Sequence, residues 1–351
     1  RKIMELKKLG NSDLMVSPYC LGTMTFGEAT NEQESHKQME KTLNSGINFF
    51  DTAELYPTCP LRAETAGDTE RIIGSWLGRN KSYREKIVLA SKVVGKGYKA
   101  IRNGEAINPK AMQKALEDSL KRLNTDYLDL YQLHWPNRGS YHFRQNWEYE
   151  PGEQKKDEVI DDINLLMDTL NEFVKTGKIR SIGLSNETCW GALQFLNVAK
   201  KHKYLRLASI QNEYSLLCRL YDLDMNELSH YENVPLLAYS PLAGGILTGK
   251  YLNNSVPKNS RLSRIPKVFG RLNERSISAV QEYIDLSKKF DIHPVHLALS
   301  FCKQKSFMGS VIFGATTNDQ LDKILAGLDI TLTTEIMSEI NTINKKFPMT
   351  F

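Results

Sequence analysis

The chain has 351 residues, of which 41% are hydrophobic and 25% are charged, the composition of an ordinary soluble globular protein with a large core. The formal net charge is only +5, and Lys and Arg are spread along the chain rather than gathered into a block. We therefore expect no nucleic-acid partner, although the mild positive excess favours a small anion. No apolar run reaches the length of a membrane span, so no membrane partner is expected.

The cysteines are odd in number and widely separated, with no Cys-x-x-Cys and no paired His spacing. This arrangement predicts reduced thiols in a cytoplasmic protein and no metal site. The N-terminus carries charge but no signal-peptide core, and the sequence does not indicate the origin of the residues before Met4. The five cysteines are Cys20, Cys59, Cys189, Cys218 and Cys302.

An N-terminal β-hairpin is expected over residues 6–16, where two strand-like pieces flank the turn cluster at residues 10–13. Short apolar runs then alternate with helical segments to the end of the chain. The eight expected strands are residues 19–23, 47–50, 87–92, 127–133, 179–184, 208–210, 236–239 and 311–313.

Helix-start signals lie between these strands. Asn31 and Glu34 have the spacing of a capping box, and Asn108-Pro109 supplies an N-cap followed by a first-position proline. The expected helices are residues 31–46, 68–77, 109–123, 161–175, 190–202, 220–231, 272–290, 294–304, 318–326 and 333–345. Because strand and helix alternate, the strands should be parallel, and eight such units close a barrel. We predict an α/β fold, a (β/α)8 TIM barrel forming one domain over residues 1–351, with additional C-terminal helices.

Polar side chains stand at the ends of three successive strands. Asp51, Lys92 and His134 end or directly follow the second, third and fourth strands, and Tyr56 lies just beyond Asp51. The C-terminal ends of barrel strands share one rim, where the active sites of such barrels are built. Each residue alone is more often structural, but the set together indicates an active site.

The chemistry of this set centres on the phenol of Tyr56. A neutral Tyr can protonate a developing alkoxide, but its ordinary pKa of about 10 is high for exchange near neutrality. We expect Lys92, held close and shielded from water, to lower that pKa toward neutrality, with Asp51 keeping Lys92 charged and oriented. His134 would donate a hydrogen bond to the substrate oxygen and fix its direction.

Four segments carry a family resemblance: residues 46–56 (GINFFDTAELY), 90–92 (ASK), 126–136 (DYLDLYQLHWP) and 182–186 (IGLSN). In this order and spacing they resemble the aldo-keto reductases nearly end to end, most of all the bacterial Tas-type reductases and the potassium-channel β-subunit branch. The resemblance implies NADPH (NADP+) extended across the barrel mouth and a small-molecule carbonyl substrate. It also implies a catalytic tetrad of Asp51, Tyr56, Lys92 and His134.

The same resemblance implies where the cofactor lies. Asn186 and Gln211 fit the groups that hold the nicotinamide carboxamide, and Tyr239 fits the ring stacked on the nicotinamide. Small residues after Tyr239 offer backbone N–H groups to the pyrophosphate, and Lys250 and Arg261 fit the phosphates. The full expected cofactor set is Thr23, Met24, Asp51, Ser185, Asn186, Gln211, Tyr239, Ser240, Pro241, Leu242, Gly244, Gly245, Lys250, Arg261, Gly314, Thr316 and Gln320.

Two positions on the adenine side depart from the family pattern. Gln320 and Ile324 stand where many members have Arg and Asn, which weakens the preference for NADPH and leaves NADH as an alternative. Arg261, or its near neighbour Arg264, is the remaining candidate for the 2′-phosphate. Thr317 and Gln320 also have capping-box spacing, which accounts for Gln320 equally well on local grounds.

The loop at residues 137–157 follows His134 and is expected to hang over the barrel mouth. It would shape an apolar substrate pocket with Met24, Tyr56 and Trp135. An aromatic patch that anchors the loop to its own barrel, or to another subunit, has nearly equal weight, and the oligomeric state is left open. The aromatic residues of the loop are Tyr141, Phe143, Trp147 and Tyr149.

Two nucleotide-binding motifs are incomplete. Residues 244–250 match a Walker A loop until Tyr251 takes the place of the metal-binding Ser or Thr, and the glycines at residues 95–97 lack a following amphipathic helix. Two other functions stay open. One is a redox-sensing interaction protein that binds cofactor and turns over slowly, and the other is an aldolase-like barrel in which Lys92 forms a Schiff base.

Overall fold

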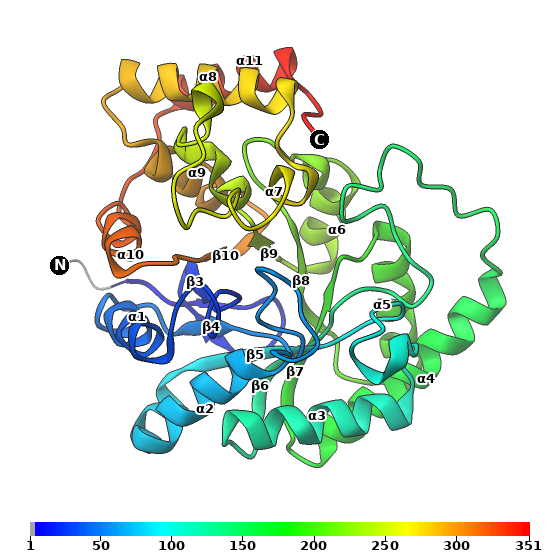
Figure 1. Ribbon diagram of the computed structural model, residues 1–351. Coiled ribbons are helices and arrows are strands. Elements are labelled where there is room, and N and C mark those ends of the chain that lie inside the picture. The colour runs from blue at the N-terminus through cyan, green and yellow to red at the C-terminus, as the bar shows by residue number, and fades with distance from the viewer. Residues whose placement is uncertain (1–3) are drawn as a thin grey trace.

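A computed structural model describes residues 4–351, and residues 1–3 lie outside the described residues. Eight parallel strands close into a barrel in the order β10-β3-β4-β5-β6-β7-β8-β9, which confirms the predicted (β/α)8 fold (Figure 1). A separate antiparallel hairpin pairs β1 with β2, also as predicted. The strands are β1 (Lys7–Lys8), β2 (Met15–Val16), β3 (Tyr19–Gly22), β4 (Phe49–Asp51), β5 (Val88–Val93), β6 (Leu128–Leu133), β7 (Ile179–Ser185), β8 (Leu207–Glu213), β9 (Leu236–Tyr239) and β10 (Met308–Phe313).

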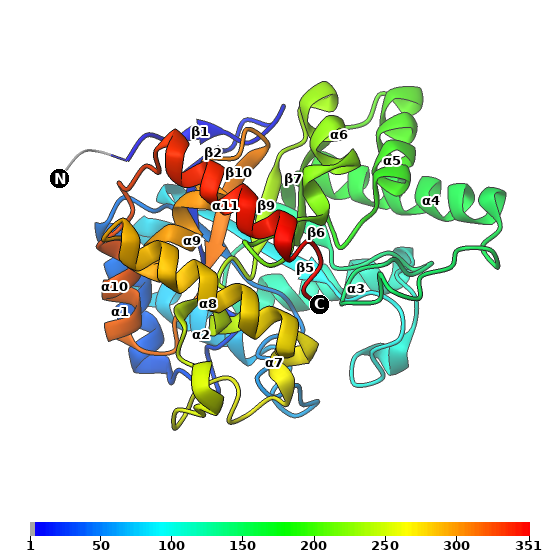
Figure 2. The same ribbon diagram turned by 90° about the horizontal axis from the view of Figure 1, so that it is seen from above.

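Helices surround the barrel between the strands, and two of them, α8 and α11, pack side by side outside this ring (Figures 1 and 2). None of the helices in the described residues is both long and apolar enough to cross a bilayer. The helices are α1 (Glu32–Asn44), α2 (Asp68–Arg79), α3 (Pro109–Leu123), α4 (Lys156–Lys175), α5 (Cys189–His202), α6 (Asp224–Glu232), α7 (Lys267–Gly270), α8 (Glu274–Lys289), α9 (Pro294–Lys303), α10 (Asn318–Leu325) and α11 (Thr334–Lys346).

Among the helices, the boundaries that differ most from the prediction are the starts of α4 and α6. Helix α4 begins at Lys156 rather than at residue 161, because Asp157 and Glu158 favour a helix N-terminus. Helix α6 begins at Asp224, since the preceding residues Leu220–Asp222 form a separate 3-10 turn.

The cap at the start of α1 is only half of the predicted capping box. The side chain of Asn31 accepts a hydrogen bond from the backbone N–H of Glu34 at 2.9 Å, as expected for an N-cap. The carboxylate of Glu34 does not return to Asn31 but binds the side chains of Lys37 and Asn318. Glu34 therefore links α1 to α10 instead of closing the cap.

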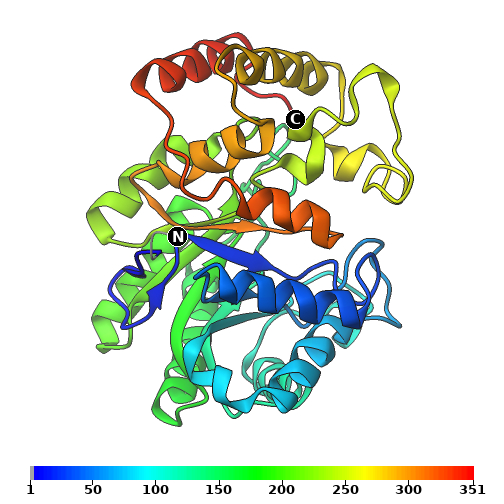
Figure 3. The same ribbon diagram turned by 90° about the vertical axis from the view of Figure 1, so that its left-hand side faces the viewer.

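The hairpin closes the N-terminal end of the barrel. Leu9, Leu14 and Val16 are buried against the residues that fill the barrel interior. Gly10, at φ 56, makes this possible, because a Cβ there would lie 2.7 Å from the carbonyl oxygen of Ala208. Figure 3 shows the hairpin at one end of the strands and the loops that follow the strands at the other.

The barrel interior is apolar near the hairpin and polar near the mouth. The interior apolar side chains are Cys20, Phe49, Val88, Ala90, Leu130, Ala208, Leu237 and Ile312. Two residues further along β4, β5 and β6, the same inward direction belongs to Asp51, Lys92 and Gln132, because strand side chains alternate with a period of two. Strand register therefore delivers these polar groups to one place at the mouth.

Candidate active site

Lys92 and Asp51 form a buried ion pair at the barrel mouth. The Lys92 Nζ donates to Asp51 Oδ2 at 2.6 Å and to the backbone oxygen of Thr52 at 2.8 Å. The side chains of Lys92 and Asp51 are 0% and 3% exposed, so water does not screen the pair. Burial lowers the pKa of Lys92, but Asp51 and Tyr56 outweigh it and raise that pKa overall. Lys92 is therefore a protonated ammonium, which is unsuited to the Schiff-base chemistry of an aldolase.

Tyr56 receives the third hydrogen bond of Lys92. The Nζ donates to the phenol oxygen at 3.3 Å, and the ammonium also lies 4.8 Å from the centre of the Tyr56 ring. Because the oxygen accepts this bond, the phenol's own proton is free to be donated elsewhere. Burial raises the pKa of Tyr56, and Lys92 only partly opposes that effect. The expected lowering toward neutrality is therefore wrong in direction, and Tyr56 is a neutral phenol.

His134 lies against Tyr56 with the ring centres 5.9 Å apart and the rings nearly perpendicular. Burial, with a further contribution from the charge of Lys92, holds the pKa of His134 well below its ordinary value, so the ring is neutral. Its buried Nδ1 has no hydrogen-bond partner among the described residues. The structure thus brings together all four predicted tetrad residues, with one cation, one carboxylate and two neutral rings.

Two glutamine side chains hold Asp51 from the opposite side. Gln132 and Gln211 each donate to Asp51 Oδ1, at 3.1 and 2.9 Å, and Gln211 also donates to Gln132 at 3.0 Å. Gly183 leaves room for this network, since a Cβ there would lie 3.0 Å from the Gln132 side chain. Sequence reasoning missed Gln132, because β6 shows no alternation in polarity that would mark its inward face.

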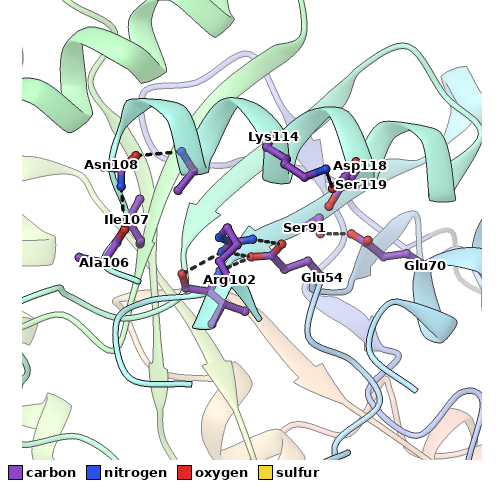
Figure 4. Close-up of polar contacts among 12 residues, drawn as sticks. Glu54, Glu70, Ser91, Arg102, Ala106, Ile107, Asn108, Lys114, Asp118 and Ser119 are labelled. Atoms are coloured by element: carbon purple, nitrogen blue, oxygen red, sulfur yellow. Dashed lines mark hydrogen bonds and ion pairs between the residues drawn. The ribbon is translucent and has the colours of Figure 1, made fainter. Parts of the chain in front are cut away.

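A second pair fixes the loop that carries Tyr56. Glu54 accepts two hydrogen bonds from Arg102, both at 2.7 Å, and a third from the backbone N–H of Val94 at 2.6 Å. Figure 4 shows this fork beside the contact of Ser91 with Glu70. Because Val94 follows β5 and Glu54 precedes Tyr56 by two residues, the pair ties the tyrosine loop to the strand of Lys92. No sequence pattern indicated this pair of Glu54 and Arg102.

The predicted nicotinamide residues are gathered beside the tetrad. The Asn186 amide donates to the backbone oxygen of His134 at 2.9 Å and accepts from the Tyr239 hydroxyl at 2.7 Å. Ser185 donates to the backbone oxygen of Gln211 at 2.9 Å. Both the nitrogen and the oxygen of the Asn186 side-chain amide are thus hydrogen-bonded, whereas the Gln211 side chain makes its hydrogen bonds through its nitrogen.

The segment after β9 has the backbone expected of a phosphate-binding turn. Ser240, Ala243, Gly244 and Gly245 all have positive φ, between 49 and 95. A Cβ on Gly244 would lie 2.4 Å from Val268, so only glycine fits there. The N–H groups of Ala243 and Gly245 already donate to the backbone oxygens of Ser240 and Leu242, so the other N–H groups of this turn are the ones that suit an anion.

Two cationic side chains lie beside this turn. The side chains of Lys250 and Arg261 lie next to the Cβ positions of Gly245 and Gly244, at 3.0 and 3.6 Å. Neither cation has a carboxylate within ion-pair distance among the ion pairs of residues 4–351. Charge and backbone together fit a pyrophosphate. Pro241 and Leu242 complete the turn as buried and half-buried residues.

On the adenine side, Gln320 acts in a helix cap. Its Oε1 accepts hydrogen bonds from the backbone N–H and the hydroxyl of Thr316, both at 3.0 Å, while Thr317 caps the N–H of Gln320. Only half of the predicted capping box is therefore present, because the Gln320 side chain binds Thr316 rather than returning to Thr317. Ile324 is only 3% exposed and packs in the core, so it offers no polar contact. Gly314 is exposed at the end of β10.

The first two predicted cofactor residues follow β3. The hydroxyl of Thr23 donates to the backbone oxygen of Asp51 at 2.8 Å, and Thr23 is fully buried. Met24 is half-buried beside it. Thr23 thus supports the strand end that carries Asp51.

The loop after β6 is fastened at its start and exposed further on. Arg138 forms a two-pronged ion pair with Glu187, and the hydroxyl of Ser140 donates to the backbone oxygen of Asn186 at 2.9 Å. Phe143 packs edge-on against Trp135, with ring centres 5.8 Å apart, whereas Trp147 is 62% exposed. Only part of the predicted aromatic set therefore faces the barrel.

Trp135 connects this loop to the tetrad. Its ring centre lies 4.9 Å from that of His134, and its Nε1 donates to the backbone oxygen of Lys96 at 2.9 Å. A Cβ on Gly95 would lie 2.2 Å from the Trp135 ring. Gly95 therefore makes room for an aromatic ring at the mouth, which explains this glycine without a dinucleotide fingerprint.

Comparison with known proteins identifies similar sequences over nearly the whole chain. The "Aldo/keto reductase family" model matches residues 18–345. "Protein tas" of Escherichia coli (strain K12) is 40% identical, over 98% of this chain and 99% of that protein. "Uncharacterized oxidoreductase YrpG" of Bacillus subtilis is 31% identical, over 97% of this chain and 96% of that protein. "Putative aryl-alcohol dehydrogenase C977.14c" of Schizosaccharomyces pombe is 28% identical, over 93% of this chain and 92% of that protein.

Proposed function

The chain belongs to the aldo/keto reductase family of NAD(P)H-dependent oxidoreductases, and from that premise we propose that it reduces an aldehyde or ketone to an alcohol, with Tyr56 as the proton donor. The observation that carries this proposal is the hydrogen bond from Lys92 to the phenol oxygen. It leaves the phenol proton free for a substrate oxygen and places a positive charge beside the phenolate that forms when the proton leaves.

The other tetrad residues prepare that proton transfer. Asp51 compensates the charge of Lys92 and fixes its direction, since the ammonium has all three donors engaged. His134, as a neutral ring against Tyr56, donates a hydrogen bond to the carbonyl oxygen and orients it. The raised pKa of Tyr56 favours reduction over alcohol oxidation near neutral pH, because oxidation needs the phenolate.

NADPH, held by the turn after β9 and by Lys250 and Arg261, would supply the hydride to the carbonyl carbon. Tyr239 and Asn186 would hold the nicotinamide beside the tetrad. The cap formed by Gln320 removes one polar group from the 2′-phosphate side, so Arg261 would carry most of the preference for NADPH over NADH.

The test is oxidation of NADPH and, separately, NADH by the purified protein with a panel of aromatic and aliphatic aldehydes, followed at the absorbance band of the reduced nicotinamide. We expect oxidation that requires both protein and aldehyde and that is faster with NADPH. Tight cofactor binding with no oxidation by any aldehyde would contradict the proposal and point to a cofactor-binding sensor instead.

A further inference from the structure

A cavity lies beside the barrel mouth, between the loop after β6 and the last residues of the chain. Its water-accessible interior is about 30 Å³, and it is lined by Tyr141 to Arg144, by residues at and after the end of β8, among them Glu213, and by Pro348 and Met349. The chain reaches it after α11, where it leads back toward the barrel (Figure 1). The hydroxyl of Thr350 donates to the backbone oxygen of Leu217 at 2.9 Å and closes this wall.

The charge on one side of the cavity is unbalanced. Arg271 donates to both oxygens of Glu213, at 2.5 and 3.1 Å, and Arg144 donates to the same carboxylate at 3.1 Å. All three side chains are at most 17% exposed. Two guanidinium groups therefore share one carboxylate, which leaves a surplus positive charge away from water.

The surplus positive charge affects the pKa of Arg144 rather than that of Arg271. Burial, followed by repulsion from Arg271, lowers the pKa of Arg144, and the attraction of Glu213 does not restore it. Arg271, which makes the two-pronged contact with Glu213, has a raised pKa instead. A buried charge without its own counter-ion is costly unless something else compensates it, so an anion in the cavity would complete the cluster.

Neutral donors line the same cavity. The side-chain Nδ2 of Asn146 is buried and has no hydrogen-bond partner among the described residues. Burial raises the pKa of Tyr141 to about 12, so its hydroxyl stays protonated and can donate. These donors suit a carboxylate, whose oxygens only accept, while Glu213, the acceptor in the same wall, is already bound by Arg144 and Arg271. The remaining walls are largely apolar and suit a hydrocarbon or aromatic body.

The rings of Phe143 and Trp135 lie between the cavity and the tetrad. Phe143 lines the cavity and packs edge-on with Trp135, whose ring touches that of His134. On the other side, Glu213 lies two residues after Gln211, which holds Asp51. A ligand whose carboxylate meets Arg144 would extend along these rings toward His134 and Tyr56.

We propose that this cavity is a subsite for a carboxylate on the carbonyl substrate, with Arg144 as its principal partner and Asn146 and Tyr141 as further donors. The substrate class is then an aldehyde or ketone with a carboxylate at the far end of an apolar or aromatic body. This inference rests on the proposed carbonyl reductase function and adds which carbonyl compounds are preferred.

The test compares 4-formylbenzoate with its methyl ester, which has the same ring and aldehyde but no charge. Wild-type protein should show kcat/KM about tenfold or more higher for the carboxylate, the size of one hydrogen bond to a charged group. In Arg144→Met this ratio should fall close to one. The variant leaves Glu213 matched with Arg271 alone, so the cluster keeps a balanced pair and the protein should fold.

Lys155→Met is the matched control, because it removes one positive charge from an exposed position on the same loop. It should leave the wild-type ratio unchanged. A wild-type ratio near one, or a ratio unaffected by Arg144→Met, would overturn the subsite while the reductase function stands. If neither aldehyde is reduced, the proposed function fails, and titration with benzene-1,4-dicarboxylate decides the subsite. Binding that depends on Arg144 supports it, and its absence overturns it.

Discussion

The strand ends and the loop after β6 place their charged groups in different ways. Lys92 and Asp51 leave adjacent strands whose register pairs residues 51 and 90, and each charge has its own partner. Arg144 leaves irregular backbone in which both Phe143 and Arg144 have positive φ, and it shares its carboxylate with Arg271. Bulky residues in that region of backbone are strained.

This difference separates the chemistry of the site from its choice of substrate. The pair of Asp51 and Lys92 is complete without a ligand, because its ion pair and hydrogen bonds are satisfied by groups at the barrel mouth itself. The cluster at Arg144 is incomplete until an anion arrives. Loops on a rigid scaffold commonly carry specificity in this way, and a change in a loop alters the substrate without altering the chemistry.

The largest effect on stability and turnover is expected from loss of Lys92. Lys92→Met would leave the carboxylate of Asp51 buried without its cation, and we expect a loss of about 3–5 kcal/mol in the free energy of unfolding together with loss of turnover. Urea unfolding measures the first effect. In the double variant Asp51→Asn/Lys92→Met, stability should largely return while turnover stays absent. A single variant as stable as wild type would contradict the buried pair.

The sequence predicted the tetrad because strand ends carry a local signal. Asp51, Lys92 and His134 each interrupt a run of apolar residues, and a parallel barrel has only one mouth at which to gather them. Gln132 was missed because every residue of β6 is buried, so no alternation in polarity marks its inward face. The predicted direction of the Tyr56 pKa shift was wrong because burial makes the largest contribution to that shift, and the sequence motif does not indicate burial.

The ion pairs around the site could not be predicted for a different reason. Arg102 and Glu54 are far apart in sequence, as are Arg144 and Glu213, and nothing in the local pattern joins them. The boundaries of α4 and α6 were displaced because the signals at helix starts were weak. The fold and the meeting of Asp51, Tyr56, Lys92 and His134 at the barrel mouth were therefore predictable, whereas the residues that position and surround them required tertiary structure.

A smaller effect is expected from two similar ion pairs, only one of which holds a residue of the tetrad in place. Glu54 with Arg102 holds the Tyr56 loop, whereas Glu70 with Arg122 joins α2 to α3, and in both pairs the arginine is less than 20% exposed. Arg102→Met and Arg122→Met should each cost up to about 3 kcal/mol of stability. Only Arg102→Met should also lower kcat beyond its effect on the folded fraction. Equal losses of kcat would show that Arg102 has no positioning role.

The fastened part of the loop should make stability depend on pH. Burial lowers the pKa of His142 to about 4, while an unfolded histidine takes up its proton near pH 6.5. The unfolded chain therefore binds more protons between these values, and stability falls as the pH drops from 6.5 toward 4. We expect His142 to account for about 2 kcal/mol of loss between pH 7 and pH 5.

Urea unfolding of wild type and His142→Gln at both pH values checks this. The variant should lose less stability on acidification, while the exposed His230→Gln should behave as wild type. His134 acts in the same direction, so some dependence remains in every variant. An unchanged slope in His142→Gln would contradict the account of this part of the loop.

The smallest effect is expected in the exposed part of the same loop. Trp147 is 62% exposed, and we expect Trp147→Ser to change the free energy of unfolding by less than about 0.5 kcal/mol and to leave turnover unchanged. Urea unfolding and steady-state rates with a neutral aldehyde measure both. A large loss of either would mean that Trp147 belongs to the substrate pocket after all.

The division between chemistry at the strand ends and selection at the loop is tested most directly by one set of kcat/KM values, measured with 4-formylbenzoate and its methyl ester in wild type, Tyr56→Phe and Arg144→Met. Tyr56→Phe should lower kcat/KM for both substrates by the same large factor, about a hundredfold or more, and should retain cofactor binding. Arg144→Met should instead change the ratio between the two substrates. Turnover that survives in Tyr56→Phe, or a ratio that is the same in all three proteins, would contradict this division.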